Sequence, residues 1–155
     1  MRLARMTDYA IRLLIYVAQH RDRLCTIAEV ATAYDISETH LMKITHQLAL
    51  GGWLETMRGK GGGIRLALPP AQIPIGAVVR TMEPDFFIVE CFSSGHSCML
   101  HGSCELTGVM DGALRSFMEY LDSHTLADVL PPPAGAAPGK VLRFYGRNKT
   151  RSLAR

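Results

Sequence analysis

The spacing of apolar residues near the start of the chain predicts helices. Apolar side chains recur every three or four residues over 7–20, which is the period of one helix face, and Thr7 can cap this helix. The sequence TIAE has the form of a capping box, in which Thr26 and Glu29 satisfy each other's backbone N–H groups. A second, short helix is therefore predicted from there to about residue 34.

A third helix and a β-hairpin follow. Ser37 can cap a helix over 38–50, which the pair of glycines after it ends. In IRLAL, from Ile64, apolar residues alternate with others, as they do in a half-buried strand. The segments WLETMR and IRLAL, joined by GKGGG, predict a hairpin with a flexible, basic tip. Three helices and a glycine-tipped hairpin are typical of a winged helix-turn-helix DNA-binding unit, which we assign to residues 1–83.

The helical pattern returns towards the end of the chain. From about residue 105 to 121, apolar side chains keep a three-four spacing on a helix that also carries charged residues. So long a stripe, after a unit with its own core, predicts a partner helix, which a two-fold homodimer supplies. The alternative is that the stripe packs only on its own winged unit. We therefore expect a mainly α-helical fold with a loop over 84–104, a dimerisation helix over 105–130 and a disordered tail over 131–155.

Charge is distributed unevenly along the chain. Residues 1–70 carry nine Lys/Arg and six Asp/Glu, residues 71–130 carry two and eight, and residues 131–155 carry six and none. The basic first half suggests that only one end of the folded unit meets a polyanion. No apolar run reaches the length that spans a bilayer, and Asp8 and Arg12 interrupt the apolar start of the chain, which lacks a cleavage site. We expect a cytoplasmic protein that does not enter a membrane.

The winged unit offers candidate contacts to double-stranded DNA. The outward residues at the start of the third predicted helix would enter the major groove: Glu38, Thr39, His40, Lys43 and Gln47. In the wing, glycines let the backbone approach the sugar-phosphate ridge, so that Arg58 or Lys60 can enter the minor groove. The RGKGGG segment lacks the residue spacing of a nucleotide-phosphate loop. A plain solvated hairpin remains the alternative.

Three of the four cysteines lie in CFSSGHSCMLHGSC, as Cys91, Cys98 and Cys104. In a reducing cytoplasm, clustered cysteines bind metals or act in redox chemistry more often than they form disulfides. Zinc sites usually open with a closer cysteine pair, so zinc completed by His96 or His101 is a minority alternative. Wider spacings suit the thiolate ligands of an iron–sulfur cluster. A thiol enzyme needs one cysteine with a positioned base, so we expect no enzyme.

The fourth cysteine, Cys25, is predicted to be a buried thiol with no part in this loop. It stands alone, immediately before the capping box of the second predicted helix. Free cysteines are among the most buried residue types and behave there as small apolar side chains. The chemistry of the chain is therefore expected in the three-cysteine loop.

These segments together resemble a known family. TDYAIRLLIYVA, TIAEVATAYDISETHLMKITHQLALGGWLETMRGKGGGIRLA, IGAVVRTMEP and the three-cysteine loop are similar to the iron–sulfur winged-helix repressors called the Rrf family. The resemblance covers about residues 1–130 and is strongest to the nitric-oxide-sensing members. It implies that Cys91, Cys98 and Cys104 hold a [2Fe–2S] or [4Fe–4S] cluster.

The resemblance also implies a fourth ligand, an aspartate at the start of the first helix of the other subunit, which here is Asp8. A carboxylate in a first turn also favours the helix dipole without any metal, and this alternative stays open. A sister branch that regulates cluster biogenesis uses a histidine where this chain has Thr107. We expect a homodimeric, nitric-oxide-sensitive repressor of operator DNA. A redox or cluster-status regulator, and a cluster-free thiol or zinc repressor, are the alternatives.

Overall fold

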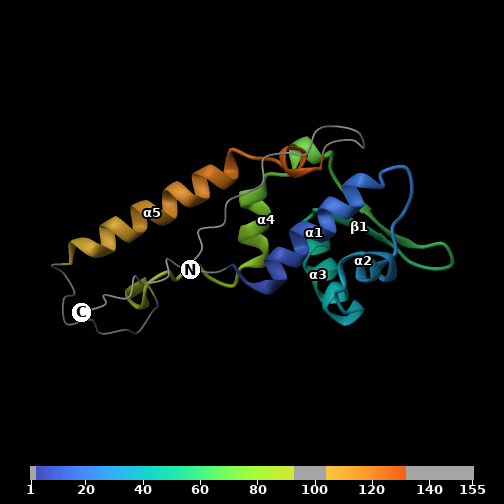
Figure 1. The fold of residues 1–155 in the computed structure, drawn as a ribbon, viewed down its shortest axis with the longest axis horizontal. Coiled ribbons are helices and arrows are strands. Elements are labelled where there is room, and N and C mark those ends of the chain that lie inside the picture. The colour runs from blue at the N-terminus through green and yellow to red at the C-terminus, as the bar shows by residue number, and fades with distance from the viewer. Residues whose placement is uncertain (1–2, 93–103, 132–155) are drawn as a thin grey trace, which may run out of the picture.

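The computed structural model describes residues 3–92 and 104–131 (Figure 1). This part of the chain is mainly helical, with a single antiparallel pair of strands, as the apolar pattern predicts. The helices and strands are α1 (Arg5–Gln19), α2 (Ile27–Tyr34), α3 (Glu38–Leu50), β1 (Leu54–Met57), β2 (Gly63–Leu66), α4 (Ile75–Met82) and α5 (Glu105–Asp122). Short 3-10 turns lie at η1 (Pro70–Gln72), η2 (Glu90–Phe92) and η3 (Leu126–Val129).

Local side-chain chemistry starts α2 and α3 where the sequence predicts. The Thr26 hydroxyl accepts the Glu29 N–H at 3.2 Å, and the Glu29 carboxylate accepts the Thr26 N–H at 2.6 Å, so the capping box is confirmed. Ser37 caps α3 by accepting the N–H of His40. Between the two helices, Asp35 adopts a left-handed φ of 53°, which turns the chain sharply. The tight connection between α2 and α3 therefore has a local cause.

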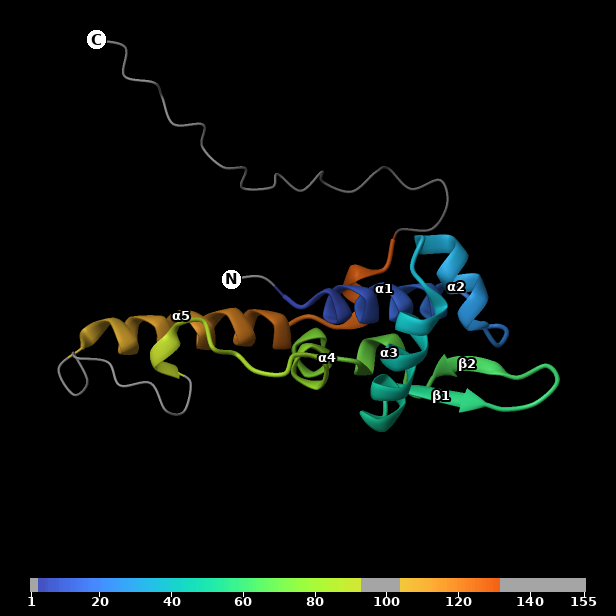
Figure 2. The ribbon, with the colours of Figure 1, turned by 90° about the horizontal axis from the view of Figure 1, so that it is seen from below.

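The core of the winged unit lies between α1 and α3, and α4 closes it (Figure 2). Its fully buried side chains include aliphatic residues from all three helices and from the segment before α4: Leu13, Leu14, Leu41, Ile44, Leu48, Ile73, Val78 and Val79. Burial of side chains of this size is worth roughly 1.5–3 kcal/mol each relative to exposure. Because one face of α3 is buried in this way, its other face is left for a partner.

The wing is an antiparallel hairpin anchored to the loop before α2. Strand residue Leu54 pairs with Leu66, and Glu55 faces Arg65 across the hairpin. The backbone of Ile64 exchanges two hydrogen bonds with that of Cys25, at 3.0 and 2.8 Å. Cys25 is fully buried at this junction, as predicted. The hairpin is therefore fixed at its base while its tip projects away (Figure 2).

This close anchoring predicts that Gly63→Ala destabilises the winged unit by about 1–3 kcal/mol. A Cβ at position 63 would lie 2.5 Å from the backbone oxygen of Cys25, which cannot move without breaking the junction. The matched control is Gly108→Ala in α5, where a Cβ meets nothing within 4 Å, and which should stabilise the helix by up to about 1 kcal/mol. Urea unfolding of both variants measures the difference, and equal stabilities would contradict the anchoring.

The predicted role of Thr7 as the cap of α1 is wrong. The helix begins at Arg5, so the capping position falls on Ala4, whose side chain cannot accept a hydrogen bond. A residue from another element takes this role, because the Glu83 carboxylate accepts the Ala4 N–H at 2.8 Å. The Thr7 side chain is buried and donates its own hydroxyl to the same carboxylate at 2.5 Å. The sequence pattern could not reveal a cap supplied from so far along the chain.

Helix α5 leaves the winged unit and extends beside the segment that follows α4 (Figures 1 and 2). Two hydrogen bonds of 2.7 and 2.6 Å between Arg80 and Asp122 tie its last turn to α4. Beyond Asp122 the chain turns back, and the N–H of buried Leu126 bonds to the oxygen of Ile73 at 2.8 Å. The segment predicted as a single dimerisation helix therefore contains α5 and a separate turn, η3. The predicted tail lies, from residue 132 on, outside the described residues.

Candidate DNA-binding surface and cluster-binding loop

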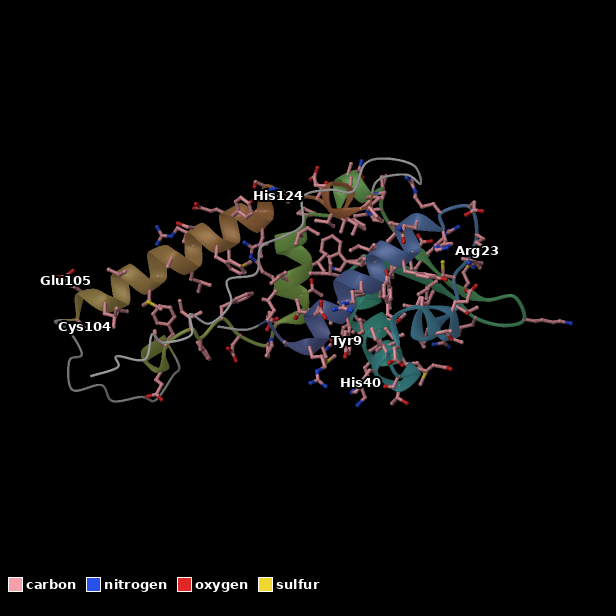
Figure 3. All side chains as sticks on the ribbon, viewed as in Figure 1. Tyr9, Arg23, His40, Cys104, Glu105 and His124 are labelled. Atoms are coloured by element: carbon pink, nitrogen blue, oxygen red, sulfur yellow. The ribbon has the colours of Figure 1, made fainter. Side chains whose placement is uncertain are left out.

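The outer face of α3 presents the residues predicted to contact bases. All of them are exposed: Glu38, Thr39, His40, Lys43 and Gln47. Figure 3 shows His40 on the outside of the winged unit. Its Nδ1 lies 3.0 Å from the Ser37 hydroxyl, which leaves Nε2 as the ring nitrogen that could contact DNA. These side chains offer donors and acceptors of the kind that read base edges.

A groove of about 380 Å³ runs between α3 and the wing. Its walls include two methionines that the sequence analysis missed, Met42 on α3 and Met57 on β1, each about half exposed. Met42 lies four residues after Glu38 and so shares its face of the helix, which is the signal that could have found it. Apolar side chains at such a place can contact sugars and thymine methyl groups. We add Met42 to the candidate DNA contacts.

The wing tip has the backbone and charge that minor-groove contact requires. Gly59 and Gly61 adopt φ angles of 98° and 81°, which side-chain-bearing residues rarely adopt. Between and beside them, Arg58 and Lys60 are exposed. The glycines therefore hold the two basic side chains at the end of a hairpin whose base is fixed in the core.

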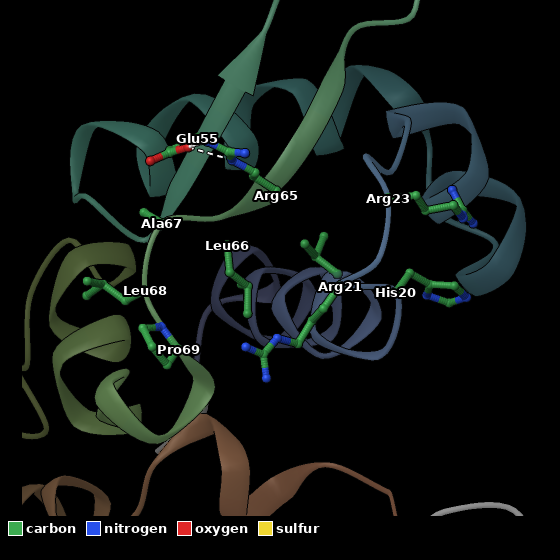
Figure 4. Close-up of a pocket in the computed structure, with 10 residues that line it drawn as sticks. His20, Arg21, Arg23, Glu55, Arg65, Leu66, Ala67, Leu68 and Pro69 are labelled. Atoms are coloured by element: carbon green, nitrogen blue, oxygen red, sulfur yellow. Dashed lines mark hydrogen bonds and ion pairs between the residues drawn. The ribbon is translucent and has the colours of Figure 1, made fainter.

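A second hollow, of about 340 Å³, lies on the outer face of the hairpin near the end of α1 (Figure 4). Arginines line it, yet most of their charge is already compensated. Arg65 pairs with Glu55 at 2.6 Å, and Arg23 pairs with Glu29 at 2.9 Å. This hollow is therefore a weaker anion site than its arginines suggest. The candidate DNA-binding surface is accordingly the outer face of α3 together with the wing tip.

The cysteine loop is described only at its two ends. Cys91 lies in the η2 turn, and Cys104 immediately precedes α5, while Cys98, His96 and His101 lie outside the described residues. Among the residues that the structure does describe, no three His, Cys, Asp or Glu side chains gather as a metal site. The loop therefore begins at a turn beside α5 and ends at the helix N-terminus.

The thiol of Cys104 lies at the start of α5, where backbone N–H groups stabilise its thiolate form. Hydrogen bonding from the backbone N–H of Thr107, and then of Leu106, holds the pKa of Cys104 below its ordinary value. The thiolate is the form that binds iron, so the start of α5 favours the reactive form. In contrast, burial raises the pKa of the Cys25 thiol. The donor chemistry at Cys104 thus fits an iron–sulfur cluster, whereas that at Cys25 does not.

Asp8 lies in the first turn of α1 with its side chain half exposed. Its carboxylate pairs with Arg12 one turn later, at 2.9 Å. Figure 3 shows Tyr9, the next residue, well away from Cys104, which lies at the far end of α5. One chain therefore does not bring Asp8 and Cys104 together. This separation is what a ligand supplied to the other subunit requires.

One flank of α5 is uncovered in the single chain. Met118 is buried against the winged unit, but Leu106 and Val109 are 59% and 65% exposed. At about 100° per residue, these two residues and exposed Tyr120 fall within roughly 60° of one another around the helix. This apolar strip on α5 is therefore a candidate interaction surface.

Comparison with known proteins fits this geometry. Residues 3–132 match the Rrf2 family, described as iron-dependent transcriptional regulators. The chain belongs to the Rrf2 family. The resemblance inferred from the sequence is thereby confirmed, and so is the assignment to transcriptional regulators.

Relatives of this Rrf2 protein span nearly its whole described length. It is 45% identical to the HTH-type transcriptional regulator NsrR of Halalkalibacterium halodurans over 132 residues, which is 84% of this chain and 90% of that protein. It is 44% identical to NsrR of Bacillus subtilis, again over 84% of this chain and 90% of that protein. Both relatives are regulators, as the winged unit predicts.

Solved structures show the same architecture. The Rrf2 chain resembles T. potens IscR with a TM-score of 0.66 and 25% identity, covering 83% of this chain and 85% of that one. CymR of B. subtilis gives a TM-score of 0.64 at 24% identity, covering 83% of this chain and 95% of that one. The winged helix-turn-helix fold with a long C-terminal helix is confirmed. In the described residues, no helix is long and apolar enough to cross a membrane.

Proposed function

We propose that this Rrf2 protein is a cytoplasmic homodimeric repressor. Its binding to operator DNA depends on an iron–sulfur cluster and is weakened by nitric oxide. The observation that carries the proposal is 45% identity to a regulator named NsrR over 90% of its length. The exposed α3 face, the glycine-tipped wing and the thiolate-favouring position of Cys104 support it.

Four residues are proposed to hold the cluster: Cys91, Cys98 and Cys104 of one subunit and Asp8 of the other. When bound, the cluster supplies iron that reacts with nitric oxide. Cys104 would contribute a thiolate stabilised by the start of α5, and Asp8 would contribute one carboxylate oxygen from an exposed helix turn. Carboxylate oxygen is a weaker partner for such iron than thiolate, so Asp8 would be the ligand most easily displaced.

The dimer converts this release into a change in DNA binding. Paired α5 helices would set the distance between two α3 helices, which must match successive major grooves of a palindromic operator. An Asp8 contact across the dimer would hold the two winged units at that distance. A coupling of about 1–3 kcal/mol between the two sites changes DNA affinity roughly 5–150-fold, which is enough for a switch.

The wing contact predicts that Lys60→Ala weakens operator binding and reduces its salt dependence. Each phosphate-neutralising side chain contributes about one unit to the slope of log affinity against log salt, so the slope should fall by about one per protomer. Fluorescence anisotropy over a range of salt concentrations measures it. Arg115→Ala on α5 is the matched control, because it removes the same charge from a residue paired with Asp111, away from the wing. Equal slopes for both variants would exclude the wing from the interface.

Anaerobic purification tests the cofactor. The proposal requires a brown protein with iron and sulfide in near-equal amounts, and a colourless protein that holds only zinc would contradict it. Release of DNA by oxygen or iron depletion, without a response to nitric oxide, would favour the redox or cluster-status regulator. Disulfide formation without visible absorption would favour the thiol switch.

A further inference from the structure

Glu83 lies where the start of α1 meets the end of α4. It is the residue at which α4 stops, and it begins the segment that leads to Cys91. One carboxylate oxygen, Oε1, accepts the Ala4 N–H at 2.8 Å and the Thr7 hydroxyl at 2.5 Å. A single side chain thus joins two segments. One is the first turn of α1, and the other is the segment from Glu83 to Cys91, which we call the stem of the cysteine loop.

The first turn of α1 depends on this contact. The helix has no side-chain cap of its own, and a carboxylate at its start also favours the helix dipole. Thr7 is fully buried, so without Glu83 its hydroxyl would lose its hydrogen-bond acceptor at a place shielded from water. Glu83 therefore holds the turn from which the next residue, Asp8, projects into solvent.

The surroundings of Glu83 connect it to α5 as well. A cleft of about 250 Å³ is lined by Glu83, by Leu3 before α1, by Phe86 in the loop stem, and by Leu114 and Phe117 of α5. Three segments meet at this cleft: the residues before α1, the segment that leads to Cys91, and α5.

We propose that Glu83, acting through Thr7, is a positioning residue for the cluster. It fixes the first turn of α1 so that Asp8 reaches the partner's cluster, and it ties this turn to the stem that carries Cys91 in its own subunit. The inference rests on the proposed function and adds to it a residue that touches neither cluster nor DNA. Because each subunit gives Asp8 to the other, Glu83 links the two cluster sites of the dimer.

Two conservative pairs of variants test the hydrogen bonds. Thr7→Val keeps the shape of the side chain and removes the hydroxyl, whereas Thr7→Ser keeps the hydroxyl. Glu83→Ala removes the acceptor, whereas Glu83→Gln keeps an oxygen in its place. Removing a partner that orients a metal ligand typically costs 10–100-fold in metal affinity, so Thr7→Val and Glu83→Ala should lose iron to a chelator about tenfold faster than wild type. Thr7→Ser and Glu83→Gln should remain close to wild type.

A double-mutant cycle with Asp8→Ala separates positioning from general stability. If Glu83 acts through Asp8, the Asp8→Ala/Glu83→Ala protein loses iron no faster than Asp8→Ala alone. If Glu83→Ala speeds iron loss as much in the Asp8→Ala background as in wild type, the inference is overturned, because Glu83 would then act by a route other than Asp8, such as the segment that leads to Cys91. Loss of the cluster in Glu83→Gln as well would overturn it too, since that variant keeps the acceptor.

Amide hydrogen exchange in the cluster-free protein measures the order of the first turn of α1 independently of iron binding. The N–H groups of Thr7 and Asp8 both bond to the Ala4 oxygen, at 3.0 and 3.3 Å. Thr7→Val should raise their exchange relative to Thr7→Ser, and unchanged exchange would overturn the inference. A colourless wild-type protein would overturn the proposed function and this inference together. A coloured wild type with unaffected Thr7→Val and Glu83→Ala variants would overturn this inference alone.

Discussion

Cys104→Ala is expected to abolish the visible absorption of the anaerobically purified protein and to make its operator affinity independent of nitric oxide. The start of α5 keeps the pKa of Cys104 low and so favours the thiolate that binds iron. Without this sulfur, the loop has lost one of three thiolate ligands, and the roughly 5–150-fold response to nitric oxide should fall to none. Absorption spectra and anisotropy titrations of the same sample measure both effects.

Cys25→Ala is the matched control for this experiment. Its side chain is fully buried, and its links to Ile64 run through the backbone, which alanine retains. The variant should lose about 1–2 kcal/mol of stability and keep its full absorption. If Cys25→Ala lost the cluster and Cys104→Ala kept it, the assignment of the ligand loop would be wrong.

Val109→Glu is expected to convert the dimer to monomers and to weaken operator binding by roughly 100-fold or more. Val109 is 65% exposed in the single chain, so the substitution should leave the folded monomer nearly unchanged in stability. In a dimer, it would place a carboxylate in an apolar contact between helices. A monomer binds only one half-site of the operator. It therefore loses the increase in affinity that two linked DNA-binding units provide. Analytical ultracentrifugation and anisotropy measure the two effects.

Arg115→Glu tests whether dimer dissociation requires a charge on the apolar flank of α5, where Val109 lies, rather than a charge anywhere on the helix. Arg115 lies on the polar face of the same helix, where it pairs with Asp111. The variant changes the net charge by more than Val109→Glu does, so a purely electrostatic effect on DNA binding would be larger in Arg115→Glu. We expect Arg115→Glu to remain dimeric, and dissociation of both variants, or of neither, would contradict the proposed interface.

The order of α2, α3 and the wing could be predicted because local chemistry starts or turns each of them. Thr26, Glu29 and Ser37 act on backbone groups within a few residues, and the glycines of the wing act on their own φ angles. The apolar face of α3 also follows from its period, which places the predicted base-reading residues outside. The family was inferred because the winged unit and the three-cysteine loop together resemble a known family, and that resemblance implied the function.

The contacts that could not be predicted join residues far apart in the chain. Glu83 caps α1 from the end of α4, and Arg80 holds Asp122 of α5, because the tertiary fold brings these elements together. No local pattern marks such partners. The stripe on α5 was predicted, but its period does not show which of its residues the chain itself covers and which stay exposed.

Control of DNA binding by the cluster can be measured in one anaerobic sample, by following operator binding and the absorption spectrum before and after addition of nitric oxide. We expect a brown dimer that binds a palindromic operator, and whose affinity falls roughly 5–150-fold as the visible spectrum changes. The Cys104→Ala protein should show neither change. DNA binding that stays constant while nitric oxide alters the spectrum, or that falls equally in Cys104→Ala, would contradict control by the cluster.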